Sequence, residues 1–168
     1  MIGDRWNVTD DEVARHYPCD DLVRAPTLQA WRGVTVRTTP ETLWPWVGQI
    51  RLAPYSYDWI DNLGRRSPQQ LMGLPEPAVG EQFSTAATRR LGRILAVEAP
   101  KHLTGEIIGA RISYVLVPEG RSTRLLMKLV TSMSRWVAPG LSVGDLIMAR
   151  RQLLNLKRLA ERPQPVAH

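Results

Sequence analysis

Cysteine is almost absent from this chain of 168 residues, which contains only Cys19. A single thiol cannot form an internal disulfide, so the sequence favours a reducing compartment. We expect Cys19 to be a small buried residue rather than a nucleophile. The chain also lacks an apolar run near the roughly 20 residues that span a bilayer, and its first residues lack the basic-then-apolar pattern of a signal peptide. These absences predict a cytoplasmic protein without a membrane span.

The common catalytic and cofactor motifs are missing as well. The three histidines, His16, His102 and His168, are too far apart in the sequence to have metal-ligand spacing. The chain has neither a glycine-rich phosphate loop nor a nucleophile elbow. We therefore expect no metal and no cofactor.

Acidic residues are in the minority, since the formal charge is +6 and the pI is about 10.1. Such a charge is typical of nucleic-acid binding, because a basic face gains affinity by neutralising phosphates. Here, however, the basic residues form scattered pairs interleaved with acids, such as Arg65-Arg66 and Arg89-Arg90, and no DNA- or RNA-binding motif accompanies them. The sequence disfavours a nucleic-acid partner.

The chain contains enough apolar residues to form one buried hydrophobic core, since 43% of its 168 residues are hydrophobic and 23% are charged. Residues 1–27 are irregular and predict an N-terminal extension with one short helix that packs against the body. Residues 28–162 form the expected single domain. Residues 163–168 are expected to be a disordered tail.

The domain begins with strong local signals. Residues 28–38 are rich in aromatic and β-branched side chains and predict a strand. A helix then starts sharply, because Thr39 can cap it and Pro40 suits the first helical position. Pro45 would clash inside a long helix, so this helix must be short or kinked. A second short helix is expected to start at Ser56 or Asp58.

Residues 93–133 contain only strand signals, and the short connections between them exclude parallel crossovers. Residues 141–162 then change period. Apolar side chains recur there at alternating steps of three and four, which predicts a long amphipathic helix. The fold class is therefore α+β: a curved antiparallel sheet wrapped around a long C-terminal helix, with two short helices after the first strand.

This order of elements, with "RGVTVRTTPETLWPWVGQIRLAPYSYDWIDNLGRRSP" and "GDLIMARRQLLNLKRLAER", resembles the START-like superfamily, also called SRPBCC, and most of all its bacterial polyketide cyclase/dehydrase branch. The resemblance covers residues 28–162. It implies a helix-grip fold with a deep cavity between the sheet and the C-terminal helix. Members bind lipids, sterols, polyketides or plant hormones, and some catalyse cyclisation or dehydration. They share no catalytic residue, so none is carried over.

Candidate ligand-binding residues follow from the pattern together with the resemblance. Tyr55, Tyr57 and Trp59 line the mouth of the cavity or, alternatively, wedge the short helices onto the sheet. Tyr114 alternates with outward residues and is expected to point inward, where its hydroxyl needs a hydrogen-bond partner. The remaining candidates come from the first short helix, the last strand and the long helix: Trp44, Met127, Leu129, Leu146, Arg150 and Leu153.

Each of these candidates has a structural alternative. Met127 and Leu129 can simply fill the core, and Arg150 can be solvated or salt-bridged instead of meeting a ligand from the edge of the helix. For acid–base chemistry only Asp58 and Glu106 are candidates. Asp58 can be merely a helix cap, and Glu106 acquires a useful pKa only if its side chain is buried in the cavity.

The sequence thus predicts a protein that binds a hydrophobic or aromatic small molecule of polyketide-, lipid- or terpenoid-like character, as a monomer or homodimer. The alternative is a cofactor-free cyclase, dehydratase or isomerase of secondary metabolism that uses the same cavity and acts mainly by positioning its substrate. A third interpretation is an interaction module that uses the extension and the basic surface.

Overall fold

A computed structural model describes residues 4–56, 63–86, 89–133 and 138–163, with side chains excepted at 86 and 138–147. The elements in chain order are β1 (Arg5–Trp6), α1 (Asp10–Ala14), the 3-10 turn η1 (Pro18–Leu22), β2 (Leu28–Val36), α2 (Pro40–Gly48), the 3-10 turn η2 (Gln49–Arg51), β3 (Ser84–Ala86), β4 (Arg89–Leu91), β5 (Arg93–Glu98), β6 (His102–Ile107), β7 (Ala110–Glu119), β8 (Ser122–Thr131) and α4 (Ala138–Ala160).

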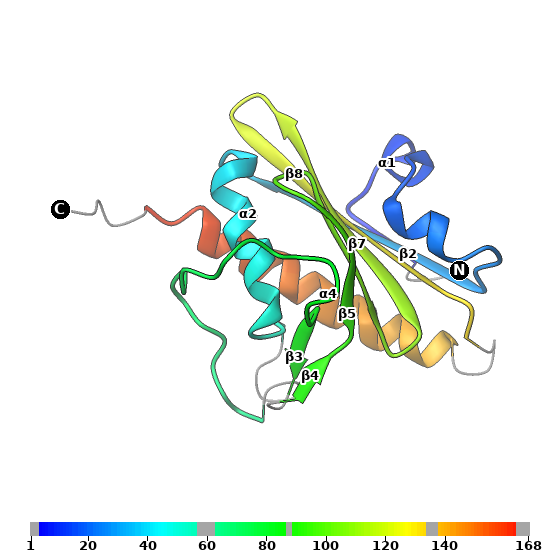
Figure 1. Cartoon of the computed structure of the whole chain (residues 1–168). Coiled ribbons are helices and arrows are strands. Elements are labelled where there is room, and N and C mark those ends of the chain that lie inside the picture. Colours follow the sequence, from blue (N-terminus) through cyan, green and yellow to red (C-terminus); the bar gives the residue numbers. More distant parts are fainter. Residues whose placement is uncertain (1–3, 57–62, 87–88, 134–137, 164–168) are drawn as a thin grey trace.

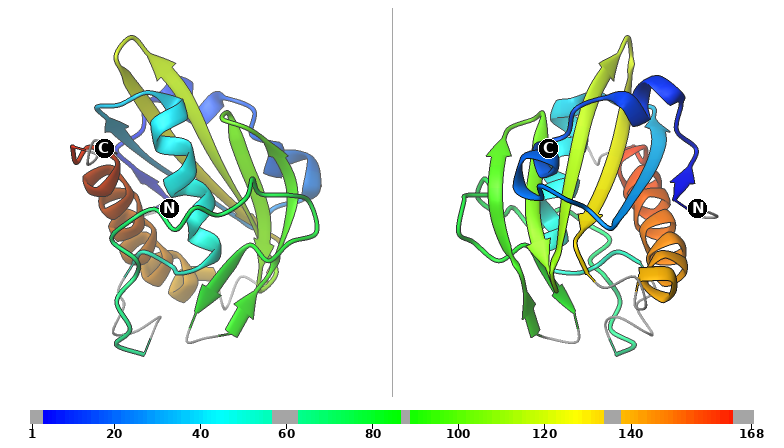
Figure 2. Two further views of the ribbon diagram at one scale, coloured as in Figure 1. Left: turned by 60° about the vertical axis from the view of Figure 1, so that its left-hand side comes forward. Right: turned by 90° about the vertical axis from the view of Figure 1, so that its right-hand side faces the viewer.

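The main sheet has six strands in the order β1-β2-β8-β7-β6-β5, and β3 pairs with β4 in a small separate hairpin (Figures 1 and 2). Neighbouring strands from β2 to β5 are antiparallel, as the short connections predict. Among the strands of the described residues, only the two-residue strand β1 pairs in parallel, beside β2. The expected antiparallel sheet is confirmed, with this short parallel addition at one edge.

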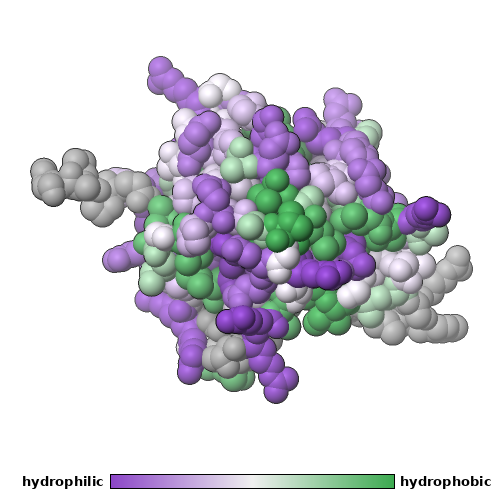
Figure 3. Space-filling model, viewed as in Figure 1, coloured by the Kyte–Doolittle hydropathy of each residue, from purple (hydrophilic) through white to green (hydrophobic). Residues whose placement is uncertain are grey.

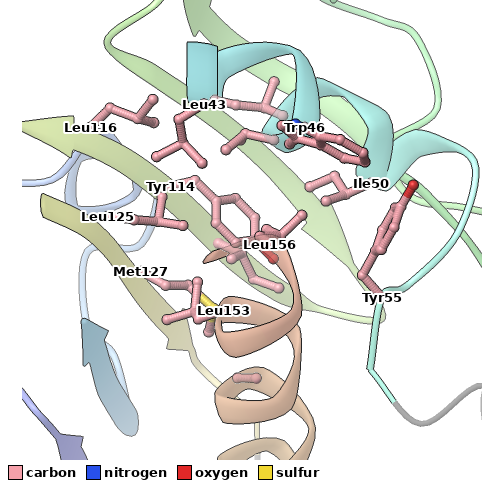
Figure 4. Close-up of a cluster of buried hydrophobic side chains, with 14 of the residues drawn as sticks. Leu43, Trp46, Ile50, Tyr55, Tyr114, Leu116, Leu125, Met127, Leu153 and Leu156 are labelled. Atoms are coloured by element: carbon pink, nitrogen blue, oxygen red, sulfur yellow. The ribbon is translucent and has the colours of Figure 1, made fainter. Parts of the chain in front are cut away.

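The inner face of the sheet packs against α2 and α4, as the helix-grip description requires (Figure 2). Because side chains along a strand point alternately to the two faces of the sheet, every second side chain of these strands belongs to this core. Figure 4 shows Met127 of the sheet beside Leu153 of α4, and Leu116 of the sheet on the side of Leu43 of α2. The predicted α+β fold is confirmed. The long helix begins at Ala138, three residues before the expected start.

Helix α2 follows the predicted signals. The Thr39 hydroxyl accepts a hydrogen bond from the amide of Thr42, and Pro40 occupies the first helical position. The helix continues through Pro45 but ends at Gly48 and tightens into η2, so it is short, as expected.

The outer face of the sheet is covered by the N-terminal extension. A second apolar cluster joins Tyr17 and Cys19 of the extension to Trp31, Leu126 and Val130 of the sheet. Cys19 is fully buried, and burial raises the pKa of its thiol to about 11, which agrees with a structural role.

Two buried cations of β8 are paired with acids of the extension. The Arg124 Nε donates to Glu12 Oε1 at 2.6 Å, and Lys128 bonds to the Asp20 carboxylate. These side chains lie among apolar groups, where an unpaired charge is costly. The ion pairs therefore fix the extension in one position on the sheet.

The Glu12–Arg124 pair predicts a pH dependence of stability. The pKa of the Glu12 carboxyl is lowered from 4.5, mainly because it accepts a hydrogen bond from Arg124. A lowered pKa in the folded state adds stability above the unfolded pKa, and this gain disappears as the pH falls through the folded pKa. Glu12→Gln should therefore lower the free energy of unfolding near neutral pH, and the difference from the parent should shrink as the pH falls below about 4.5.

The measurement is urea unfolding across that pH range, with Asp11→Asn as a control at an exposed neighbour. A difference between Glu12→Gln and the parent that stays constant with pH would contradict this role of the carboxylate.

Candidate functional site

The candidate site is built around Tyr114, on the inner face of strand β7. Its partners in the sheet register, Leu103 and Met127, belong to the same core, so the inward orientation expected from alternation is confirmed. The side chain is 3% exposed, and Figure 4 shows its ring pointing from the strand toward α4. A buried tyrosine requires a partner for its hydroxyl.

That partner is Gln152 of α4. The Tyr114 hydroxyl donates to Gln152 Oε1 at 2.5 Å, and Gln152 Nε2 donates to the carbonyl of Pro54 at 2.7 Å. One amide side chain thus connects the sheet, the long helix and the segment after η2. Because each of these bonds is directional, they fix where α4 lies on the sheet.

A second set of amides continues this network toward α2. Asn155 Nδ2 donates to the carbonyl of Tyr55 at 2.8 Å, and Gln49 Nε2 donates to the Tyr55 hydroxyl at 2.6 Å. Gln49 also accepts a bond from the amide of Met72 at 2.8 Å. Tyr55 has a φ of 53°, a left-handed conformation that is uncommon for a residue with a side chain, and these contacts hold it there. Tyr55 is therefore a buried connector.

An aromatic wall lies beside Tyr114. The centroids of the Phe83 and Tyr114 rings are 6.1 Å apart, and the two ring planes are tilted by 40° relative to each other. Phe83 rests on the sheet at Gly105, where an added Cβ would lie 2.2 Å from a ring carbon. Glycine at 105 thus leaves the space that the phenyl ring occupies.

The apolar wall extends from Tyr114 toward the strand ends that lead into α4. Ile112 of β7 lies opposite Leu129 of β8 in the register, and both belong to the inner core. They are 9% and 7% exposed, compared with 1% for Met127. The described side chains on this part of the sheet are therefore apolar and slightly less covered than those of the core.

On the other side of Tyr114 the interior is filled by side chains. Met127 and Leu153 lie there against Leu43, Leu125 and Leu156, each almost or fully buried (Figure 4). The described part of this region is a packed core, which is the structural alternative foreseen for Met127. Leu153 has the same surroundings.

Trp44 lies at a different place, a surface cleft on the outer side of α2. Its indole Nε1 donates to Glu76 Oε2 at 2.8 Å. The cleft has a volume of about 290 Å³ and is lined by α2, η2 and the segment 71–77. The Arg51 guanidinium beside it is held by the carbonyls of Gly48 and Pro75 and by Glu81. The polar groups here stabilise the loop on the helix.

Two of the three charged candidates, Arg150 and Glu106, are also away from the interior. Arg150 is exposed, and its guanidinium lies 5.0 Å from the ring centroid of Trp6. Glu106 pairs with Arg93 Nε at 2.7 Å and with Arg111 Nη2 at 3.2 Å. Glu106 lies on the outer face of the sheet. It pairs in register with Arg111, which pairs with Val130, and Val130 belongs to the outer apolar cluster. The surface alternative for both residues agrees with these positions.

The structure does not describe the side chains of four candidates. Tyr57, Asp58 and Trp59 lie outside the described residues, and Leu146 is described only as backbone within α4. Their roles remain predictions.

Sequence reasoning missed Gln49, Gln152, Asn155 and Phe83. The two α4 residues left a signal, because they are uncharged polar side chains next to the apolar stripe of Leu153 and Leu156. Nothing local marks Gln49, whose partners lie 6 to 23 residues away. Phe83 is the sole phenylalanine of the chain, but its position over Gly105 depends on tertiary structure.

The described residues contain no group of three or more His, Cys, Asp and Glu side chains that could hold a metal ion. None of their helices is long and apolar enough to cross a membrane.

Comparison with known proteins supports the fold. No family model matches the sequence, and no curated protein matches it. Among solved structures, a Mesorhizobium loti protein is similar with a TM-score of 0.54 and 20% identity, covering 81% of this chain and 98% of its own. A Nitrosospira multiformis protein has a TM-score of 0.55 and 12% identity, covering 77% and 94%. The KanY protein has a TM-score of 0.51 and 11% identity, covering 80% and 98%.

These similarities show a shared fold. Because the sequence identity is so low, no residue role and no ligand is transferred from these structures to this chain.

The contact between Phe83 and Gly105 gives a prediction. Gly105→Ala should destabilise the protein by roughly 1 to 3 kcal/mol, because the new methyl group meets an aromatic ring that is itself enclosed. The measurement is urea unfolding. Gly48→Ala is the matched control, since its Cβ would be no closer than 3.4 Å to a side chain. Equal stability of Gly105→Ala and the parent would show that Phe83 is not fixed on the sheet.

Proposed function

We propose that this protein binds an apolar or aromatic small molecule between the inner face of the sheet and α4, on the Ile112 side of Tyr114. The observation that carries the proposal is the Tyr114–Gln152 hydrogen bond at the border between the packed core and the apolar wall of Ile112 and Leu129. A pocket with apolar walls and one convergent polar pair is the usual design of a small-molecule site.

The walls favour a ligand class. Phe83, Ile112 and Leu129 offer flat and branched apolar surface, and the Tyr114 hydroxyl can turn from Gln152 to a ligand oxygen. A polyketide-, lipid- or terpenoid-like molecule with one polar group suits this combination. We keep Tyr57 and Trp59 as proposed mouth residues and Leu146 as a proposed contact from α4.

Binding is favoured over catalysis by the position of Glu106, the acid–base candidate that lies within the described residues. Among the described residues, Glu106 is paired with two arginines on the opposite face of the sheet and is not available to the interior. We place the protein in the cytoplasm, because its one cysteine suits a reducing compartment.

The experiment that tests this function is native mass spectrometry of freshly purified protein, followed by titration with anilinonaphthalene sulfonate. We expect a co-purified small molecule or saturable uptake of the probe, which combines an apolar ring system with an oxygen acceptor. Protein that carries no additional mass and takes up no probe would refute the proposal.

Tyr114→Phe separates the polar anchor from the packing of the ring. The change removes one hydroxyl, so the affinity for the probe or the identified ligand should fall about fivefold, equivalent to about 1 kcal/mol. Tyr17→Phe is the matched control, because Tyr17 is also buried and its hydroxyl donates to the carbonyl of Glu12 at 2.8 Å on the outer face.

Both variants should lose a similar amount of stability, about 1 kcal/mol for one hydrogen bond. Only Tyr114→Phe should change the affinity. An equal loss of affinity in both variants would mean that the effect comes from stability and not from the proposed anchor.

A further inference from the structure

Exposed apolar side chains are concentrated in one loop. Of the eight large apolar residues that are exposed in the described part of the chain, five fall between 63 and 79: Leu63, Leu71, Met72, Leu74 and Val79. Three of them are more than half exposed, at 73% for Leu63, 58% for Met72 and 65% for Val79. Figure 3 shows apolar surface beside hydrophilic groups on the face where this loop crosses α2. Such clustering marks an interaction surface more often than isolated exposed residues do.

A basic face of α4 lies against the same loop. Arg151 and Arg158 are exposed and are spaced by seven residues, which places them on one side of the helix. Arg162, also exposed, follows two residues after the helix ends. Leu154, also exposed, lies one turn before Arg158 on this side. Arg158 Nη2 donates to Gln69 Oε1 at 3.2 Å, so the loop and the basic face are in contact.

The positive charges are close enough to affect each other. The pKa of the Arg158 guanidinium is lowered, first by burial and then by the charges of Arg162, Arg151 and Arg66. Arg66 belongs to the loop, so the cluster spans both elements. Among the described residues, two acids of these elements have other partners: Glu76 bonds to Trp44, and Glu161 bonds to Lys157 and to the amide of Arg37.

We infer that this surface, formed by the loop 63–79, the face of α4 with Arg151, Leu154 and Arg158, and Arg162 just after the helix, docks the protein on an anionic lipid bilayer. The arginines complement anionic headgroups, and the apolar side chains enter the interface between headgroups and acyl chains. The inference does not depend on the proposed ligand site, because it uses only surface residues.

The arrangement favours a bilayer over an acidic protein. The exposed apolar residues lie in an irregular loop, without the regular spacing that a helix or strand would offer to a complementary groove. A fluid bilayer accepts such side chains in any register, whereas a protein partner needs a fitted surface with a packed core.

The test is co-sedimentation with vesicles of phosphatidylcholine alone or with about one-third phosphatidylglycerol. We expect binding to the anionic vesicles that weakens as salt is raised, and little binding to the neutral ones. Arg158→Gln or Arg162→Gln should lower the partition coefficient about fivefold, equivalent to about 1 kcal/mol per basic residue near the surface. Met72→Ser should lower it about tenfold, since a methionine side chain no longer enters the interface.

Matched controls lie away from this surface. Arg121→Gln removes an exposed charge at the β7–β8 turn, and Leu22→Ser removes an exposed apolar side chain of the extension. Both should bind vesicles like the parent, and circular dichroism should show that all variants are folded. The use of two arginine variants guards against a local effect of losing the Arg158–Gln69 bond.

Three outcomes would overturn the inference. These are the absence of binding to anionic vesicles, equal binding to both vesicle types, and equal losses in the control variants. Capture on immobilised polyglutamate without vesicle binding would assign the surface to an acidic protein partner instead.

Discussion

Strand β8 is buried along almost its whole length, from Thr123 to Thr131, and this includes the side chains on both of its faces. A strand with two buried faces needs cover on both sides of its sheet. Helices α2 and α4 supply it on the inner face, and the N-terminal extension supplies it on the outer face. Most other features follow from this double burial, including the paired cations Arg124 and Lys128, whose charges the extension neutralises.

On the inner face the same requirement places polar groups between two apolar layers. Gln152 and Asn155 lie on the side of α4 that meets the sheet and the segment after η2, where each amide has a specific acceptor. Apolar packing is non-directional and would allow the helix to slide, whereas these amides fix its position along the sheet. A rigidly placed helix also maintains any space that it encloses, which connects this network to the proposed ligand site.

Much of the fold could be predicted from the sequence because it depends on local signals. The Thr39 cap, the strand alternation around Tyr114 and the apolar stripe of α4 each require only a few neighbouring residues. The helix start was expected at Leu141 but is at Ala138, because Pro139 lies in the first turn, where a missing amide costs no hydrogen bond.

The site could be predicted only in part. The orientation of Tyr114 follows from alternation, but its partner Gln152 is 38 residues away and no local rule joins them. Strand β1 has only two residues and its pairing depends on the docked extension, so periodicity could not reveal it. The apolar residues of the surface loop 63–79 follow no helical or strand period. The sequence pattern therefore could not show that several of them are exposed; only the solvent exposure of each side chain in the structure does.

The outer edge of β5 shows how the sheet ends. The amide of Ile94 donates to the carbonyl of Glu81, and its carbonyl accepts from the amide of Gly80. A register shift follows between Ile94 and Ala96. An open strand edge is a template on which another chain can add a strand, and irregularity or coverage removes that template. At the opposite edge of the sheet, β1 pairs with part of β2 and so covers part of its backbone edge. The two borders of the sheet therefore hinder the stacking of molecules edge to edge, so the apolar strands can remain long without becoming a nucleus for aggregation.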